Sequence, residues 1–495
     1  MVIYLLLNIL FSVVYCQENH STIDLAKNIE TSIRLHENYI KNDSSLTKNL
    51  FNTATVKKIN NEYQVLKSYK VNTHKQDKKK WTILIYIAGA NDLYKYALRN
   101  IEQMMQVGSN EQLNILIHFD FHIRGKQKET KRLYVEKNHL LQIGDLAPHD
   151  SGDAQSLINA SEWAIKNYPS TFFGLILWNH GTGSCDPHFM RKIVNPNDFF
   201  YYNKENHKIS LDRSREFLKY IENNENTSND RGICFDDTTR NYLDNKKLAL
   251  ALEKICQLRN QKKIDIILMD ACLMSGIEIA NQCEPYANFL VSSEEVVLGP
   301  GYNYAATLKP LQKDNLTPYD FALSTVKIFA QTYAPISNDF TQSALNLNSI
   351  NQFVIYFKEF VELLSKYKQC DTRGHLKKTI RLAGSREMVT HFSEPSYIDL
   401  IHFLDNINNF ISQNPKKIAF NKKENDYIKE IKLFIIQKLI PSLHKIIIGN
   451  VNGDSIPKAH GVYIYFPKYQ IDESYKNTTF PITTKWLQFL QNLKL

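Results

Sequence analysis

The sequence lacks the short motifs that mark several common classes of enzyme and binding protein. It contains no Cys-x-x-Cys pair, no glycine-rich phosphate loop, no metalloprotease motif and no EF-hand spacing. We therefore expect no structural zinc site and no metal site of a standard type. The longest basic run is Lys78–Lys80, and no aromatic residues are interleaved with it. Nucleic-acid binding is not favoured, although the formal net charge is +9.

Long apolar runs are also scarce. Residues 2–15 form one, and no later stretch reaches membrane-spanning length without charges, so we expect no membrane span in the mature chain. The run has the length of a signal-peptide core, although it lacks the usual preceding Lys or Arg. We predict a signal peptide at 1–16, cleaved near Cys16, and a secreted or extracytoplasmic protein. A lipid-modified Cys16 and a buried N-terminal helix are the alternatives.

Residues 17–80 differ from the rest of the chain. They are polar, rich in Asn and Lys, and contain neither Gly nor Pro. Several apolar residues between Leu25 and Ile40 recur at helical spacing. We interpret 17–80 as a pro-segment or N-terminal extension that is helical or partly ordered.

From Trp81 onward, short apolar runs alternate with helical patterns. The runs expected to form buried strands are 82–88, 113–119, 173–178, 264–269 and 288–293, with a more exposed strand at 131–136. Helices are expected from Asn91 or Asp92, over 154–167 and over 245–258. Such alternation predicts an α/β fold, in which a mostly parallel sheet is covered by helices on both faces.

The pattern also predicts how the chain is divided. We assign the α/β pattern to a first domain at 81–300, interrupted by a polar insertion at 186–230. Beyond about residue 305 the pattern becomes mainly helical, with strands near 343–347 and 462–466. Residues 301–495 are therefore predicted to form a mainly helical C-terminal domain.

Two turns that follow predicted strands carry chemically reactive side chains. The strand 173–178 is followed by Asn179 and His180, and the strand 264–269 by Asp270, Ala271 and Cys272. In open parallel sheets the functional crevice lies at the carboxyl ends of the strands. We therefore expect His180 and Cys272 to meet at one edge of the sheet.

A cysteine acts as a nucleophile in its thiolate form, which needs a base or a positive environment. A helix expected to begin near Leu273 would favour the thiolate through its dipole. His180 would accept the proton and later protonate a leaving amine, and the backbone N–H groups of Gly181 and Cys272 could form an oxyanion hole. The structural alternative is a buried apolar cysteine and a hydrogen-bonded surface histidine.

Six segments of the chain form a recognisable set. They are Trp-Thr-Ile-Leu-Ile-Tyr-Ile-Ala-Gly-Ala-Asn-Asp-Leu (81–93), Leu-Ile-Leu-Trp-Asn-His-Gly-Thr-Gly (175–183), Asp-Asp-Thr-Thr (236–239), Met-Asp-Ala-Cys-Leu-Met-Ser (269–275), Ser-Ser-Glu-Glu-Val-Val-Leu-Gly-Pro-Gly-Tyr-Asn-Tyr (292–304) and Ala-His-Gly-Val-Tyr-Ile-Tyr-Phe-Pro (459–467). Together they resemble the clostripain family, which is related to caspases, legumains and gingipains. The resemblance implies a caspase-like α/β/α sandwich. It also implies a cysteine endopeptidase that works through a Cys/His dyad and a thioester, without an obligatory third residue.

The resemblance implies cleavage after Arg or Lys, with the basic side chain held in an acidic pocket. Asp270 matches an acid near that pocket, although it could equally stabilise the turn. The family often has Gly-Asp-Gly and an aromatic residue where this chain has Gly299-Pro300-Gly301-Tyr302. Glu294 or Glu295 could compensate for the missing aspartate, or could be structural.

Members of the family mature by cutting themselves between the His and Cys turns. The insertion at 186–230 suits that role, and an ordinary surface insertion is the alternative. Its possible cleavage sites are Arg191, Lys192, Lys204, Lys208, Arg213 and Arg215. Some members depend on calcium, for which Asp236 and Asp237 are weak candidate ligands; no other cofactor is expected.

Two further functions remain open at this point. One is an asparaginyl-type peptidase or transpeptidase, as in legumain-like relatives. The other is a catalytically silent secreted binding or scaffold protein of the same fold. In either peptidase interpretation the partners are protein or peptide substrates.

Overall fold

The structure is a computed structural model of the whole chain. It describes residues 54–59, 62–67, 77–123, 125–144, 146–185, 199–214, 232–413 and 420–493. The predicted signal peptide at 1–16 and the helical spacing between Leu25 and Ile40 lie outside the described residues. So does much of the insertion at 186–230. Among the described residues, no helix is both long enough and apolar enough to cross a membrane.

The fold is built on one 11-stranded sheet with the order β16-β14-β13-β12-β7-β3-β4-β5-β6-β1-β2. Its five central strands are parallel: β13 (Ala287–Ser292), β12 (Ile264–Asp270), β7 (Ser170–Trp178), β3 (Lys79–Gly89) and β4 (Leu113–Phe121). The apolar runs predicted from the sequence lie in these strands and are mostly buried. Strands covered on both faces have this composition.

Antiparallel strands extend the sheet on both sides. On one side lie β5 (Glu129–Glu136), β6 (His139–Gln142), β1 (Ala54–Ile59) and β2 (Glu62–Lys67); on the other lie β14 (Thr341–Asn346) and β16 (Ile447–Asn452). The strand at 131–136, predicted to be more exposed than the central strands, contains half-buried residues among buried ones. Leu133 and Val135 are buried because β6 continues the sheet beyond β5. The hairpin β1–β2 lies within the segment predicted to be helical or partly ordered.

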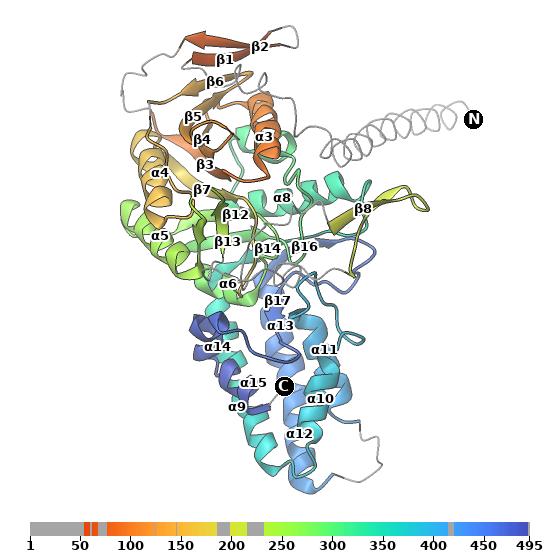
Figure 1. The fold of residues 1–495 in the computed structure, drawn as a ribbon. Helices are drawn as coiled ribbons and strands as arrows, with labels where there is room; N and C mark the ends of the chain where they lie inside the picture. Colours follow the sequence, from red (N-terminus) through yellow and green to blue (C-terminus); the bar gives the residue numbers. More distant parts are fainter. Residues whose placement is uncertain are drawn as a thin grey trace, which may run out of the picture.

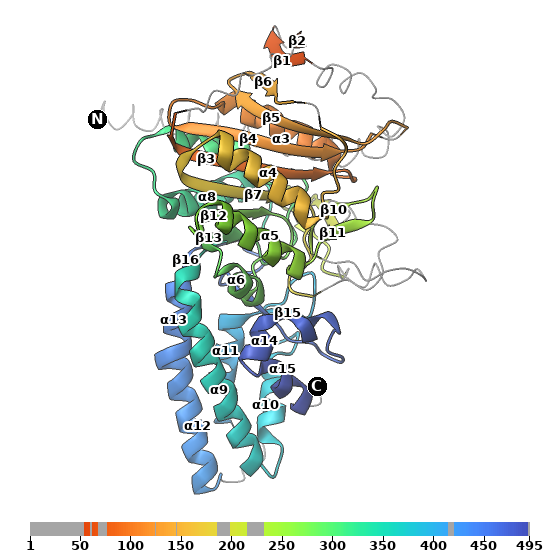
Figure 2. The same ribbon diagram turned by 90° about the vertical axis from the view of Figure 1, so that its left-hand side faces the viewer.

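Helices cover both faces of the sheet (Figures 1 and 2). One layer holds α4 (Ala154–Asn167), α5 (Asn245–Leu258) and α6 (Ile277–Cys283); the other holds α3 (Tyr94–Val107), α7 (Tyr304–Leu308) and α8 (Pro318–Tyr333). Helices α4 and α5 have the predicted bounds, since Asp153 and Asp244 accept backbone N–H bonds at their N-termini. The predicted α/β/α sandwich with a mostly parallel sheet is confirmed.

Most of the remaining helices extend away from one end of the sheet (Figures 1 and 2). They are α9 (Ile350–Cys370), α10 (His375–Ala383), α11 (Leu400–Phe410), α12 (Lys422–Phe434), η6 (Ile435–Leu439), α13 (Ile440–Ile446), α14 (Thr479–Thr483) and α15 (Trp486–Leu493). The predicted helical C-terminal region is therefore present. The sheet nevertheless continues past the domain boundary predicted at residue 300, because β14 and β16 belong to it.

Among the described residues, three small two-stranded sheets lie outside the main sheet. They pair β10 (Ile233–Asp236) with β11 (Asn241–Leu243), β8 (Phe200–Asn203) with β9 (Lys208–Leu211), and β15 (Tyr397–Asp399) with β17 (Tyr463–Tyr465). The β8–β9 hairpin belongs to the predicted insertion. It contacts the segment before β14 through a parallel bridge between Ile209 and Ser337.

Candidate active site

The turns that follow β7 and β12 lie side by side. Trp178 and Asp270 are paired at the ends of these parallel strands, and the Asn179 N–H donates to the Asp270 carbonyl at 3.3 Å. A Cβ atom on Gly181 would lie only 2.5 Å from the carbonyl oxygen of Cys272. Glycine is needed there for the two backbones to approach this closely. The expected meeting of the two turns is therefore present in the fold.

His180 is held by a carboxylate from a third strand end. Its Nε2 atom lies 2.7 Å from Oδ1 of Asp92, and its side chain is 2% exposed. Asp92 belongs to the turn between β3 and α3. The ring of Phe235 packs edge-on against the imidazole, with 6.4 Å between the two ring centres. The Nδ1 atom of His180 is buried and has no hydrogen-bond partner among the described residues.

From the sequence, Asp92 is expected only as a possible helix cap. The structure does not place it there, because the α3 N-cap residue is Leu93, whose N–H bonds to the Asn91 side chain. A signal for Asp92 was nevertheless present: it follows a buried strand, as His180 and Cys272 do. What the sequence could not provide is the strand order, in which β3 is the neighbour of β7.

Two buried amide side chains fix the His180 turn. Asn179 donates to the carbonyls of Ala88 (2.5 Å) and Phe235 (3.3 Å), and accepts from the Phe235 N–H at 2.8 Å. Asn91 donates to the same two carbonyls, each at 2.9 Å. These bonds join the ends of β3 and β7 to β10, so the imidazole sits on a rigid support.

The Cys272 turn differs from the prediction in its local structure. No helix begins near Leu273, which instead adopts a left-handed conformation with φ of 58°. Helix α6 begins at Ile277, after Gly276, so the expected helix dipole does not act on the cysteine. A left-handed conformation is strained for leucine and persists only where surrounding contacts impose it.

The thiol of Cys272 is also enclosed. It is 2% exposed, and its Sγ atom accepts a bond from the Val297 N–H at 3.3 Å. Burial raises the pKa of the Cys272 thiol to about 12, and the charges of Glu295 and Asp270 also act to raise it. The expected thiolate environment is therefore absent in this conformation.

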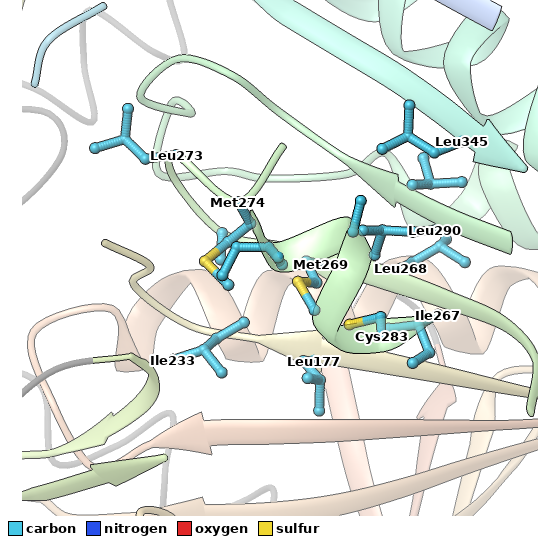
Figure 3. Packing of buried hydrophobic residues seen from close by; sticks show 14 of the residues in the cluster. Leu177, Ile233, Ile267, Leu268, Met269, Leu273, Met274, Cys283, Leu290 and Leu345 are labelled. Carbon is cyan, nitrogen blue, oxygen red and sulfur yellow. The ribbon is translucent and has the colours of Figure 1, made fainter. Parts of the chain in front are cut away.

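The contacts that hold the Cys272 turn in this conformation come largely from the closing segment, residues 459–467, which carries part of the family resemblance. Tyr463 donates from its hydroxyl to the Leu273 carbonyl at 2.7 Å, and from its N–H to the Ser275 carbonyl at 3.0 Å. The Ser275 hydroxyl donates to the Gly461 carbonyl at 2.7 Å. On the other flank, the Leu273 N–H donates to the Glu295 carbonyl at 3.3 Å. Figure 3 shows the apolar packing around the turn, with Leu273 and Met274 labelled.

Asp270 is engaged by the glycine-rich turn that departs from the family pattern. Its Oδ2 atom accepts bonds from the Tyr302 N–H at 3.1 Å and the Tyr304 hydroxyl at 2.9 Å. Gly301, with φ of 62°, packs so closely that a Cβ atom would lie 2.5 Å from this oxygen. Burial raises the pKa of Asp270 to about 7. In this structure the carboxyl group holds the 301–304 turn.

The two neighbouring glutamates have different surroundings. Glu294 is buried, accepts from the Gly461 N–H at 2.9 Å, and has its pKa raised well above the usual value by burial and by Asp399. Glu295 is buried as well, but its Oε2 atom faces the guanidinium of Arg213 at 3.4 Å. The other terminal nitrogen of Arg213 lies 3.0 Å from Oδ1 of Asp339.

The possible calcium ligands lie apart from the cysteine turn, after β10. The carboxylate of Asp236 binds the Lys128 ammonium group, which also lies 2.8 Å from Asp120. Asp237 is exposed and interacts electrostatically with Asp92 and His180. Within the part of the chain that the structure describes, no three His, Cys, Asp or Glu side chains are grouped so that they could hold a metal ion.

Comparison with known proteins places this geometry in context. The model of the clostripain family matches residues 85–197 and 219–486. Clostripain from Hathewaya histolytica is 24% identical over 280 residues, which cover 51% of this chain and 46% of clostripain. The match thus spans less than half of clostripain's length.

Solved structures resemble the fold over a larger share of the chain. A secreted C11 cysteine protease from Bacteroides thetaiotaomicron, bound to an irreversible peptide inhibitor, has a TM-score of 0.52 and 17% identity, covering 83% of this chain and 99% of that one. An inactive zymogen C11 protease from Parabacteroides distasonis has a TM-score of 0.50 and 17% identity, with coverages of 85% and 99%. At this identity the likeness concerns the fold.

Proposed function

This chain belongs to the clostripain family of cysteine peptidases, and from that premise we propose that it is a secreted endopeptidase with Cys272 as nucleophile and His180 as proton carrier. One observation carries the proposal: β7 and β12 are parallel neighbours, so the two turns share one edge of the sheet. Crevices at the carboxyl ends of such strands are where α/β proteins place their reactive groups.

The proposed reaction is amide hydrolysis in two steps. The Cys272 sulfur attacks the scissile carbonyl carbon while its proton passes to the imidazole of His180. The imidazolium then protonates the leaving amine, which leaves a thioester that water hydrolyses with the imidazole as base. The N–H groups of Gly181 and Cys272 are the proposed donors to the oxyanion.

We propose that the described conformation is a resting form of the enzyme. Its support is the enclosed thiol, which a substrate cannot reach while Cys272 is 2% exposed. The raised pKa of Cys272, caused mainly by burial, also disfavours the reactive thiolate. Activation must expose the sulfur to solvent and substrate, and cleavage within 186–230 is the proposed trigger.

We further propose a preference for substrates with Arg or Lys before the scissile bond. Of Asp270, Glu294 and Glu295, Glu295 is the one whose carboxylate contacts a guanidinium, that of Arg213. Its backbone carbonyl also accepts from Leu273, the residue after the nucleophile. A substrate guanidinium that displaced Arg213 would meet the Glu295 and Asp339 carboxylates, and such charge-assisted pairs are selective for Arg.

The test is incubation of the purified full-length protein with and without calcium, followed by mass mapping of new termini. We expect wild-type protein to produce termini after Arg or Lys within 186–230, and Cys272→Ala and His180→Ala to produce none. Cys370→Ala, which changes a half-buried cysteine outside the site, is the matched control. Cleavage by Cys272→Ala would refute the mechanism. A chelator then shows whether calcium is required.

A peptide panel separates the alternatives. Peptides that differ only before the scissile bond, with Arg, Lys or Asn there, distinguish a basic-residue peptidase from an asparaginyl-type enzyme. Transfer of the acyl group to an added amine would identify a transpeptidase. Absence of any turnover by the processed chain would favour the silent scaffold.

The same panel tests the role of Glu295. Glu295→Gln is expected to lower kcat/KM for peptides with Arg before the scissile bond by about 10- to 100-fold. Glu359→Gln changes a surface residue paired with Lys438 and should not lower it.

A further inference from the structure

The carboxylate of Asp92 lies where it can control the orientation and tautomer of the His180 ring. It accepts at 2.7 Å from Nε2, and the side chain is 25% exposed. An ionised carboxylate has no proton to donate, so Nε2 must carry the hydrogen of this bond. In the neutral ring, Nδ1 is then the unprotonated nitrogen and can accept a proton.

The second observation concerns Nδ1 itself. This nitrogen is buried and has no hydrogen-bond partner among the described residues. A buried polar atom without a partner costs free energy, and such atoms require an explanation. An explanation exists if Nδ1 is kept free for the proton of the Cys272 thiol, on the adjacent turn.

We propose that Asp92 is a positioning residue, which fixes the His180 ring so that Nδ1 is the proton-transfer nitrogen. The inference rests on the proposed peptidase function and adds a third member to the Cys/His pair. The proton moves from the Cys272 sulfur to Nδ1, and from Nδ1 to the nitrogen of the leaving amine. Asp92 stays ionised throughout and stabilises the imidazolium that forms between the two steps.

The surroundings of the Asp92 turn support a fixed role. The turn is anchored by the Asn91 side chain, which bonds to the carbonyls of Ala88 and Phe235, and by the Asp237 N–H, which donates to the Ala90 carbonyl at 3.0 Å. The backbone that carries Asp92 is therefore held in place beside the imidazole, while the Oδ2 atom of Asp92 has no hydrogen-bond partner among the described residues. Positioning groups act in this way because their own geometry is locked by neighbouring contacts.

Two carboxylates interact with the imidazole, each from a different element. They are Asp92 after β3 and Asp237 after β10. Of the two, only Asp92 has a hydrogen bond to His180 among the contacts of the described residues. Asp237→Asn is thus a matched variant, which removes a nearby charge and leaves the hydrogen bond in place.

The kinetic test uses the processed enzyme and a fluorogenic peptide with Arg before the scissile bond. Asp92→Asn is expected to lower kcat by about 10- to 100-fold with little change in KM. The acid limb of its pH profile, where the imidazole base becomes protonated, should move to lower pH, because the imidazolium loses a stabilising anion. Asp237→Asn should move that limb less and keep most of kcat, and Asp92→Glu should recover part of the lost activity. A merely structural role would not move the pH profile.

A second readout does not depend on activity. Long-range ¹H–¹⁵N spectra of histidine-labelled full-length protein report which ring nitrogen of His180 carries the hydrogen. The expected result is hydrogen on Nε2 in the wild type and a mixture of tautomers in Asp92→Asn. Hydrogen on Nδ1 in the wild type would overturn the inference, as would wild-type kcat and pH profile in Asp92→Asn. Failure of the wild type to cleave any peptide would instead count against the proposed function, and the spectra would still decide the role of Asp92.

Discussion

The two turns that meet at the site are built in opposite ways. The His180 turn is held by polar side chains within the strand region, since Asn91 and Asn179 tie the ends of β3, β7 and β10 together. The Cys272 turn is held from outside, by Glu295 on one flank and by Tyr463, about 190 residues away in sequence, on the other. The first turn is held by bonds among neighbouring strand ends, which are 56 and 91 residues from Asn179 in sequence, whereas the second depends on the closing segment of the chain.

The imidazole of His180 and the thiol of Cys272 also differ in how far each is prepared for the reaction. The imidazole already has its Asp92 partner, and its Nδ1 atom has no hydrogen-bond partner in the part of the chain that the structure describes. The thiol is enclosed and does not lie at the N-terminus of a helix. Burial raises its pKa to about 12. The proton acceptor is therefore prepared in the resting structure and the nucleophile is not. Activation should act on the Cys272 turn and leave the His180 turn unchanged.

The largest expected effect concerns the reactivity of the thiol before activation. With a pKa raised by burial from 9.0 to about 12, the thiolate fraction of Cys272 near neutral pH is about 10³-fold below that of an ordinary thiol. Alkylation by iodoacetamide in the unprocessed chain should thus be slow and rise with pH well above 9. Mass spectrometry of the labelled peptide measures the rate, with the half-buried Cys370 as internal reference. Rapid labelling of Cys272 at pH 7 would remove the contrast between the turns.

The sequence predicted the parts of the fold that are encoded locally. The central strands are continuous apolar runs, and α4 and α5 begin at aspartates that cap them. Strand β16, with Gly449 and two asparagines, has no such pattern, because it is only half-buried at the edge of the sheet. Its place depends on pairing with β14, which a local pattern cannot show.

At the site, the meeting of the two turns could be predicted, because carboxyl ends of parallel strands share an edge. The conformation after Cys272 could not, because the left-handed Leu273 is imposed by bonds from Tyr463 and Glu295. The enclosure of the thiol likewise depends on Val297, which is 25 residues away in sequence. Local propensity favoured a helix there, and tertiary contacts overrode it.

An intermediate effect is expected on the His180 side. Asn179→Ala removes the oxygen that accepts from the Phe235 N–H and a donor to two carbonyls. Both carbonyls keep their bonds from Asn91, so the main cost is the unsatisfied N–H. The free energy of unfolding should fall by about 2–3 kcal/mol. Urea denaturation measures this, with the exposed Asn425→Ala as control. A loss below about 0.5 kcal/mol would contradict the support assigned to Asn179.

The smallest expected change in stability concerns the Cys272 turn. Tyr463→Phe removes the hydroxyl that bonds to the Leu273 carbonyl and should cost about 1 kcal/mol. Because that bond helps to hold the strained Leu273, the variant should also speed alkylation of Cys272 in the unprocessed chain, which Asn179→Ala should not do. Tyr469→Phe, at a residue that is 75% exposed, is the matched control. Equal alkylation rates in Tyr463→Phe and Asn179→Ala would mean that the two turns open as one unit, and that activation is not confined to the cysteine side.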